Sequence, residues 1–232
     1  MVKPPLNFPE GPWKSLLERA FWLMESIQSD GFTLPRWSLG GGTVLMFYYA
    51  HRKSKDIDIF FPDPQFLGYV NPRLGGRGEE VTTEYKDGTE FVKLFLPEGE
   101  IDFVASSTLT KNPFEEYEVL DRKVLLETPI EIVAKKLWYR GDMATPRDLL
   151  DLALVIEHHY SEILEHSDVF AKKIEAFTEQ CYSRRAFMLP VFEEIEKIEF
   201  KLGFDECLDR ANDLKADLLK KSTPTPLTLI KQ

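Results

Sequence analysis

Two short patterns restrict the folds open to this chain more than any other feature. Residues 39–43 read Leu-Gly-Gly-Gly-Thr, and residues 56–58 read Asp-Ile-Asp, with thirteen residues from Thr43 to Lys55 between the glycines and the aspartates. Apolar residues over 43–50 predict a helix directly after the glycines, and the alternation over 56–61 predicts a half-buried strand. The order strand, glycine turn, helix, strand therefore predicts a sheet with flanking helices.

The two aspartates form a candidate metal site. Successive side chains of a strand point to opposite faces, so Asp56 and Asp58 share one face while Ile57 and Ile59 enter the core. Two carboxylates this close repel each other, and a cation offsets that cost. Mg²⁺ is commonly bound by one or two protein carboxylates together with substrate phosphates. We therefore predict a Mg²⁺ site at this pair, and Mn²⁺ is an alternative metal.

The glycines form a candidate phosphate site. Gly41 and Gly42 have no Cβ, so the backbone can approach a ligand closely. The start of the following helix adds N–H donors and a positive dipole end that suit an anion. The Thr43 hydroxyl could donate to the same phosphate. A glycine turn or an Asp-x-Asp pair alone is usually structural, but the two together predict metal-dependent nucleotidyl transfer.

The rest of the chain indicates a mixed N-terminal half and a helical C-terminal half. We expect a helix at about 12–28, a mobile loop over 71–80 and a three-stranded meander over 81–105. The character changes to helix from about residue 115, with helix starts at Thr128-Pro129 and Thr145-Pro146. Further helices are expected over 161–180, 184–201 and 205–221, before a loose tail at 223–226.

These elements predict an α+β fold, with a mixed sheet and flanking helices followed by a helical region, and the chemistry predicted for the glycines and aspartates would make that sheet nucleotidyltransferase-like. We expect a nucleotidyltransferase core over 1–112 with its N-terminal helix. A helical region over 113–232 would follow, and its residues 128–155 would contribute to the active site.

The composition of the chain limits the classes of partner that it can bind. The net charge is −10 over 232 residues, so a globally basic surface for nucleic acid is absent, although a local basic cluster could still bind RNA. No apolar stretch approaches the ~20 residues of a membrane span, and the N-terminus lacks the apolar region of a secretory signal. Only Cys181 and Cys207 are present, far apart. We expect a cytoplasmic protein without a disulfide framework and without membrane association.

Two regions resemble a known family. Residues 41–43 (Gly-Gly-Thr) and 51–60, which include His51-Arg52-x-Ser54 before Asp56-Ile57-Asp58, are similar to the nucleotidyltransferase core of the AbiEii/AbiGii toxin family. Residues 134–152, with Ala-Lys-Lys-Leu and then Arg-Asp-Leu-Leu-Asp-Leu, resemble a second motif of that family. The family belongs to the DNA polymerase beta-like nucleotidyltransferase superfamily, so the resemblance implies the same chemistry.

The resemblance implies further roles in the N-terminal half. Superfamily members usually present a third carboxylate from a neighbouring strand, and Asp102 is the candidate, with Glu100 on the same face as its competitor. Asp56, Asp58 and Asp102 would then hold two Mg²⁺ ions. Arg52 and Ser54 would contact phosphate, or else shape the turn before the strand.

In the helical half, Lys136 would bind the triphosphate, with a solvated helix lysine as the alternative. Asp148 would act as a base for the attacking hydroxyl, with a helix cap as the alternative. Asp151, one turn further along, would orient Arg147 or Lys136, or simply lie on the helix surface.

As a whole, the resemblance implies an NTP-dependent enzyme that releases pyrophosphate, with Asp56, Asp58, Asp102 and Asp148 as catalytic residues. It implies the toxin of a bacterial toxin–antitoxin or phage-defence pair, with an antitoxin protein as partner and the 3′ end of tRNA as a candidate acceptor. The alternatives are transfer to a protein or to a small molecule such as an aminoglycoside. A catalytically silent member that binds nucleotide or a partner protein is a further alternative.

Overall fold

A computed structural model describes residues 4–222, so the expected tail at 223–226 lies outside the described residues. The described chain forms two compact units. Among the described residues, unit 1 contains residues 4–132 and 196–201, and unit 2 contains residues 133–195 and 202–222. The boundary expected between residues 112 and 113 falls inside unit 1.

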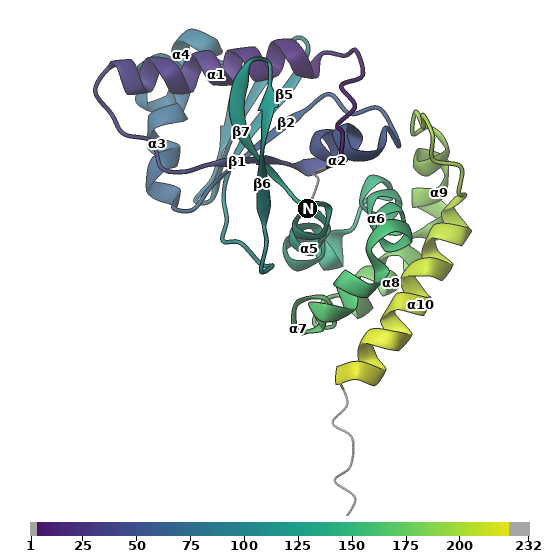
Figure 1. Ribbon diagram of the computed structural model, residues 1–232. Helices are drawn as coiled ribbons and strands as arrows, with labels where there is room; N and C mark the ends of the chain where they lie inside the picture. Colours follow the sequence, from purple (N-terminus) through teal and green to yellow (C-terminus); the bar gives the residue numbers. More distant parts are fainter. Residues whose placement is uncertain (1–3, 223–232) are drawn as a thin grey trace, which may run out of the picture. The chain divides into compact units, whose positions relative to one another are not determined.

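A seven-stranded mixed sheet forms the centre of unit 1 and confirms the predicted α+β class (Figure 1). Its strand order is β3-β4-β5-β2-β1-β7-β6, with parallel pairing between β2 and β5 and between β1 and β7. In chain order the strands are β1 (Ser38–Gly40), β2 (Ile57–Phe61), β3 (Tyr85–Asp87), β4 (Phe91–Leu96), β5 (Gly99–Ala105), β6 (Phe114–Val119) and β7 (Arg122–Glu127).

Alternation along the central strands separates a buried face from a face that carries polar groups. Ile57 and Ile59 of β2 are fully buried, as are Ile101 and Phe103 of β5. The residues between them are half-buried and lie on the opposite face. The predicted inward positions in β2 and β5 are therefore confirmed, and Asp58 and Asp102 lie on the outward face. The strand expected over 56–61 begins at Ile57, so Asp56 precedes it.

Helices cover the buried face of the sheet. α1 (Trp13–Ser29) packs against β2 and β5, and α2 (Gly41–Tyr49) packs against β1, β2 and β7. The Trp13 ring meets Phe47 edge-on at 4.7 Å between centroids, which joins α1 to α2. Both helices agree with the expected ones, because their apolar spacing follows the helical period.

Two expectations for the N-terminal half are wrong. The segment 71–80 is not a structureless loop, because it contains η2 (Pro72–Leu74) and α4 (Arg77–Val81). Gly75 and Gly76 have positive φ angles of 76° and 75° and turn the chain between these two helices. The strand expected to begin at 81 begins at Tyr85, since α4 continues to Val81. A short 3₁₀ helix η1 (Pro64–Phe66) and α3 (Leu67–Val70) precede this segment.

The change to helix expected from residue 115 is also wrong. Strands β6 and β7 form an antiparallel hairpin there, and β7 pairs with β1. The hairpin turns at Leu120 and Asp121, whose φ angles are 49° and 58°. Two consecutive positive φ angles suit the twist of a two-residue hairpin, but neither residue is a glycine or asparagine that would have indicated the turn.

Unit 2 is helical and begins within α5 (Pro129–Arg140). Both predicted helix starts are confirmed, at Pro129 and at Pro146. The helix expected over 205–221 is confirmed, since a helix runs from Phe204 to Ser222. The helix expected over 161–180 is wrong, because the helix from Pro146 continues across a kink at His159 to Glu165 and two separate helices follow it. The helical elements after α5 are η3 (Gly141–Met143), α6 (Pro146–Glu165), α7 (Ser167–Phe170), α8 (Ile174–Ser183), α9 (Arg185–Glu193) and α10 (Phe204–Ser222).

Residues 196–201 belong to unit 1, although the helices on either side belong to unit 2. The helix expected through 201 ends at Glu193. Backbone groups beyond it bond instead to the segment before β2, with Lys53 N–H donating to Glu196 O at 2.8 Å and Ile198 N–H donating to His51 O at 2.9 Å. The segment that leads into the Asp56–Asp58 strand is thereby held by a distant part of the chain.

Candidate active site

One row of residues crosses five neighbouring strands of the sheet. The row reads Lys86, Lys93, Asp102, Asp58 and Gly40 from β3 to β1, each residue in register with the next. Side chains paired in register point to the same face, about 5 Å from their neighbours. Two carboxylates on the central strands therefore lie side by side between the lysines and the glycine turn.

The glycine turn lies against Asp58. Gly41 has a φ of 70°, and a Cβ there would stand 1.9 Å from Asp58 Oδ2. The absence of a side chain at Gly41 thus lets its backbone lie directly beside the carboxylate. Gly41 also begins α2, a helix of nine residues, and the side chains described here do not cap that helix start. Backbone donors of the helix start are consequently next to the carboxylate face.

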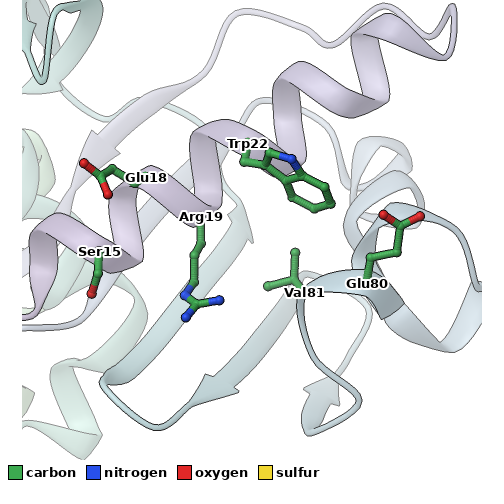
Figure 2. A pocket seen from close by; sticks show the side chains of 6 residues that line it. All are labelled: Ser15, Glu18, Arg19, Trp22, Glu80 and Val81. Carbon is green, nitrogen blue, oxygen red and sulfur yellow. The ribbon is translucent and has the colours of Figure 1, made fainter.

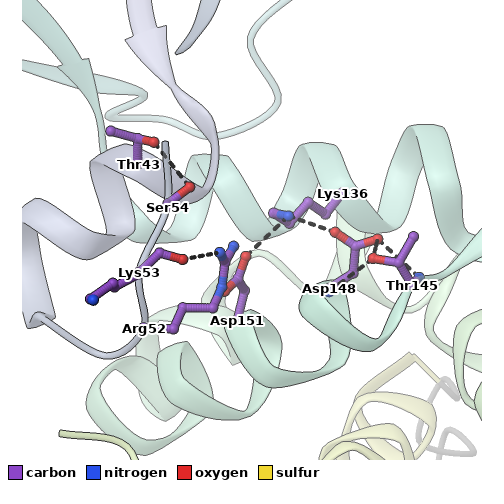
Figure 3. A network of polar contacts seen from close by, with 8 residues as sticks. All are labelled: Thr43, Arg52, Lys53, Ser54, Lys136, Thr145, Asp148 and Asp151. Atoms are coloured by element: carbon purple, nitrogen blue, oxygen red, sulfur yellow. Dashed lines mark hydrogen bonds and ion pairs between the residues drawn. The ribbon is translucent and has the colours of Figure 1, made fainter. Parts of the chain in front are cut away.

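The Thr43 hydroxyl is buried and holds the strand that carries the aspartates. Thr43 Oγ1 donates to Asp56 O at 2.6 Å. It also lies 3.0 Å from Ser54 Oγ (Figure 3). Thr43 is fully buried and Ser54 is half-buried. These contacts attach the first turn of α2 to the segment before β2. Phosphate contact by Thr43 and Ser54 stays a prediction.

The Arg52 guanidinium lies beside the second glycine of the turn. A Cβ at Gly42 would stand 2.3 Å from Arg52 Nη2. Arg52 is 3% exposed, and its Nη1 donates to Lys53 O at 3.2 Å (Figure 3). A fixed positive charge thus adjoins the start of α2, where a phosphate would also be favoured.

Asp56 points toward the beginning of β5. Its Oδ1 accepts a hydrogen bond from Glu100 N–H at 3.1 Å, and a Cβ at Gly99 would approach the same oxygen at 3.0 Å. Within residues 4–222, no group of three or more His, Cys, Asp or Glu side chains is arranged to hold a metal ion. The structure therefore brings Asp58 and Asp102 together, but it does not gather all three predicted ligands into one cluster.

The surroundings of Asp102 disfavour the ionised form of its carboxyl group. Burial and the adjacent Asp58 carboxylate raise the pKa of Asp102 to about 6, against the opposing effect of Lys93. Asp102 Oδ1 is buried and, among the described residues, has no hydrogen-bond partner. A buried acceptor next to a second carboxylate is suited to a small hard cation. Asp58 and Asp102 thus fit a Mg²⁺ ion that substrate phosphate would also bind.

Glu100 shares the outward face of β5 but is in a different environment. Its side chain is 37% exposed and bonds to Lys93, whereas the Asp102 side chain is 15% exposed and in register with Asp58. The geometry therefore favours Asp102 over Glu100 as the carboxylate that completes the pair.

Two residues near the site were missed by the sequence analysis. Lys93 Nζ lies 2.9 Å from Asp102 Oδ2, and Glu127 is fully buried, with Oε1 accepting from Ser38 Oγ at 3.1 Å. The Glu127 carboxylate also lies against Gly40, where a Cβ would approach Oε2 at 2.4 Å. A charged residue at the end of the apolar run Val124-Leu125-Leu126 was the available signal for Glu127. Lys93 has no local signal, since its position depends on strand pairing.

Unit 2 holds a separate ionic cluster between α5 and α6. Lys136 Nζ lies 2.5 Å from Asp148 Oδ1 and 3.1 Å from Asp151 Oδ2 (Figure 3). Both aspartates are buried, at 1% and 0% exposure. The Asp148 carboxylate also accepts from Thr145 N and Thr145 Oγ1, and Asp148 N–H donates to Thr145 Oγ1, which completes a capping box.

These contacts set the charge state of Asp148. Burial acts to raise its pKa, but the Lys136 ammonium and the Thr145 hydroxyl reverse this effect and lower the pKa. A carboxylate with a lowered pKa is a weaker proton acceptor. The contacts therefore favour a capping role that also holds Lys136, and the predicted base role is not supported by them.

A hollow elsewhere on unit 1 is lined by none of the predicted site residues (Figure 2). It lies between α1 and α4. Its lining residues are Ser15, Glu18, Arg19, Trp22, Glu80 and Val81.

A mixed sheet that pairs two carboxylates on adjacent strands, beside a glycine turn that opens a helix, is the arrangement expected of a nucleotidyltransferase. Residues 22–221 match the family described as "Nucleotidyl transferase AbiEii toxin, Type IV TA system". The match covers most of the chain, and the protein belongs to this family. It is therefore a nucleotidyltransferase-family enzyme and the toxin of a type IV toxin–antitoxin system, which implies an NTP substrate and an antitoxin.

Solved structures of similar proteins include two with low sequence identity. JHP933 from Helicobacter pylori is 16% identical, with a TM-score of 0.41 over 90% of this chain and 95% of that chain. The nucleotidyltransferase toxin MenT4 from Mycobacterium tuberculosis H37Rv is 16% identical, with a TM-score of 0.48 over 89% of this chain and 84% of that chain. No curated protein matches the sequence. No helix among residues 4–222 has the length and apolar character needed to cross a membrane.

Proposed function

We propose that this protein transfers a nucleoside monophosphate from an NTP to an acceptor hydroxyl and releases pyrophosphate. The acceptor oxygen bonds to the α-phosphorus, the bond to the pyrophosphate oxygen breaks, and the hydroxyl proton leaves. The observation that supports this reaction is the register of Asp58 with both Asp102 and Gly40. That register joins a carboxylate pair to a phosphate-binding turn on one face of the sheet.

The glycine turn would receive the triphosphate. Gly41 and Gly42 present backbone without side chains, and the N-terminal end of α2 supplies donors and a partial positive charge. Arg52, fixed against Gly42, would add a full positive charge that does not depend on pH. Thr43 and Ser54 would act through the shape of this turn, because the Thr43 hydroxyl already bonds to Ser54 Oγ and to Asp56 O.

The carboxylates would hold the metal. When bound, Mg²⁺ would polarise the α-phosphoryl group and neutralise charge on the leaving pyrophosphate. Asp58 and Asp102 would be its main protein ligands. Asp56 would become a third ligand if its hydrogen bond from Glu100 N–H were broken. In this proposal the outward face of β2 and β5 orients the α-phosphate for in-line attack.

The cluster in the helical region would support nucleotide binding through charge. Lys136 would contact the triphosphate, with Asp148 and Asp151 setting the direction of its side chain. A lysine held by two buried carboxylates is kept charged and in one orientation, which lowers the entropy cost of binding a phosphate.

For the acceptor we propose an RNA 3′ hydroxyl, on the strength of the family resemblance alone. The net charge of −10 means that any RNA contact would be local and sensitive to salt. A specific antitoxin protein, a cytoplasmic location and Mn²⁺ as a substitute metal belong to the same proposal.

The test is incubation with each α-³²P-labelled NTP, Mg²⁺, total RNA and total protein, followed by a denaturing gel. The wild-type protein should label an RNA band with one preferred NTP, and Asp58→Asn should lower the rate by at least about 100-fold. Asp121→Asn is the matched control, because it removes the same charge from the exposed β6–β7 turn.

Three outcomes would contradict parts of the proposal. Equal labelling by Asp58→Asn and wild type would exclude the metal role of Asp58. Label on a protein band or on a small molecule would replace the RNA acceptor with another class. Heat of NTP binding in a calorimeter without any release of pyrophosphate would identify a silent nucleotide-binding protein.

A further inference from the structure

Lys93 occupies the position next to the carboxylate pair on the side away from the glycine turn. It pairs in register with Asp102 across β4 and β5, just as Asp58 pairs with Asp102 across β2 and β5. Its ammonium lies 2.9 Å from Asp102 Oδ2 and also bonds to Glu100 Oε2. Asp102 therefore has a positive neighbour on one strand and a negative neighbour on the other.

The burial of these groups makes the Lys93 contact stronger than an ordinary surface ion pair. The Lys93 side chain is 27% exposed and the Asp102 side chain is 15% exposed. Exposed pairs contribute little because water screens them, whereas partly buried pairs are screened much less. Two adjacent carboxylates also repel each other unless a cation offsets their charge. In the absence of a metal, Lys93 supplies that cation from within the sheet.

We propose that Lys93 is a positioning residue that acts as an internal counter-cation and competes with the divalent metal for Asp102. This inference rests on the proposed function, in which Asp58 and Asp102 hold the metal. A metal held by Asp58 and Asp102 would place positive charge close to the Lys93 ammonium, so Lys93 would lower the affinity of the empty protein for the metal. Nucleotide phosphate would offset that loss, since it brings additional ligands and negative charge.

The competition predicts an effect opposite to that of an ordinary active-site substitution. Removing the Lys93 charge should tighten metal binding, because the bound metal no longer has to overcome the ammonium. Lys93→Met removes the charge, Lys93→Gln removes it but retains a donor for Asp102, and Lys93→Arg keeps it. Lys86→Met is the matched control, since Lys86 is exposed, lies in the same row and is one strand further from Asp102.

The experiment is titration of the full-length metal-free protein with Mn²⁺ alone, with free Mn²⁺ followed by electron paramagnetic resonance. We expect Lys93→Met and Lys93→Gln to lower the Mn²⁺ dissociation constant by about tenfold, the order expected for removing a repelling charge. Lys93→Arg and Lys86→Met should stay within about threefold of wild type. An unchanged or weaker affinity in both neutral Lys93 variants would overturn the inference.

A thermal unfolding series separates this inference from the proposed function. Without metal, Lys93→Met should unfold at a lower temperature than Lys86→Met, and saturating Mn²⁺ should restore more of its stability than it restores in wild type. Asp58→Asn reports on the metal site itself. If Asp58→Asn binds Mn²⁺ as wild type does, the proposed metal site fails; if it loses binding while the Lys93 variants resemble Lys86→Met, only the role of Lys93 fails.

Discussion

The Lys136 ammonium lies 2.5 Å from Asp148 Oδ1, and this pair joins α5 to the first turn of α6. The same ammonium reaches Asp151 Oδ2 at 3.1 Å. One cation thus offsets two buried carboxylates, so the stability of unit 2 depends on a residue that the proposed function also assigns to the nucleotide.

Lys136→Met should destabilise unit 2 by about 3 kcal/mol, because it leaves two buried carboxylates without their cation. The measurement is urea unfolding at pH 7, compared with wild type. Lys220→Met is the control, since Lys220 also pairs with an aspartate on a helix of unit 2, but its side chain is 76% exposed. A surface pair of this kind should change stability by less than about 1 kcal/mol. Equal losses in the two variants would contradict the buried-cluster interpretation.

Acid should remove the contribution of the ionised Asp148 carboxylate to the free energy of unfolding. The pKa of Asp148 is lowered in the folded protein, because Lys136 and Thr145 outweigh the effect of burial. The pKa of an aspartate in the unfolded chain is near 4, and above that pH the ionised Asp148 carboxylate stabilises the folded protein. This stabilisation disappears as the pH falls through the lower pKa that Asp148 has in the folded protein. The difference in unfolding free energy between wild type and Asp148→Asn should therefore be large at pH 7 and shrink below about pH 4. A difference that is constant from pH 7 to pH 3 would rule this out.

The sequence predicts features formed by residues close together in the chain, such as the helix start at Thr145. It does not predict which strands pair in the sheet. The Thr145-Pro146-Arg147-Asp148 pattern predicts the helix start because a capping box involves residues only three apart. Asp58 and Asp102 are 44 positions apart, and only the parallel pairing of β2 with β5 makes them neighbours. Sequence alternation gives the face of each strand but not the strand order.

The missed hairpin and the missed lysine have related causes. Strands β6 and β7 turn at Leu120-Asp121, a pair without the glycine or asparagine that usually marks positive φ angles. Lys93 belongs to an alternating strand and has no local motif, so its contact with Asp102 appears only once β4 and β5 are paired. Both features depend on tertiary contacts that a single sequence does not specify.

Gly41→Ala should impair nucleotide transfer far more than it impairs folding. The new Cβ would stand 1.9 Å from Asp58 Oδ2, so the carboxylate or the turn must move. A displacement of about 1 Å at a reacting centre can lower the rate by about 100-fold. The positive φ of 70° adds a backbone strain of about 1–2 kcal/mol to the cost of folding.

Gly76→Ala provides the control for that backbone strain. Gly76 has a φ of 75°, and a Cβ there would meet no atom within 4 Å. It should lose similar stability while its transfer of label from α-³²P-NTP stays near that of wild type. If both variants lose transfer equally, the contact between Gly41 and Asp58 is not the cause.

The metal-free protein should lose stability as the pH rises from about 4 to about 6, because of Asp102. Burial and Asp58 raise the pKa of this carboxyl group from 3.8 to about 6. In that window the unfolded state releases its proton while the folded state still holds it, so ionisation favours unfolding. The shift of about two pKa units corresponds to a loss of about 3 kcal/mol, which should be nearly complete by pH 7. Asp102→Asn should lack it, as measured by urea unfolding in EDTA at pH 4, 5, 6 and 7. Asp205→Asn, at an exposed ion pair with Arg185, should follow the wild-type curve. Parallel pH curves for Asp102→Asn and wild type would show that the pKa of the Asp102 carboxyl group is not raised.

Added Mg²⁺ should stabilise the wild type mainly above pH 6, where binding no longer requires release of the Asp102 proton.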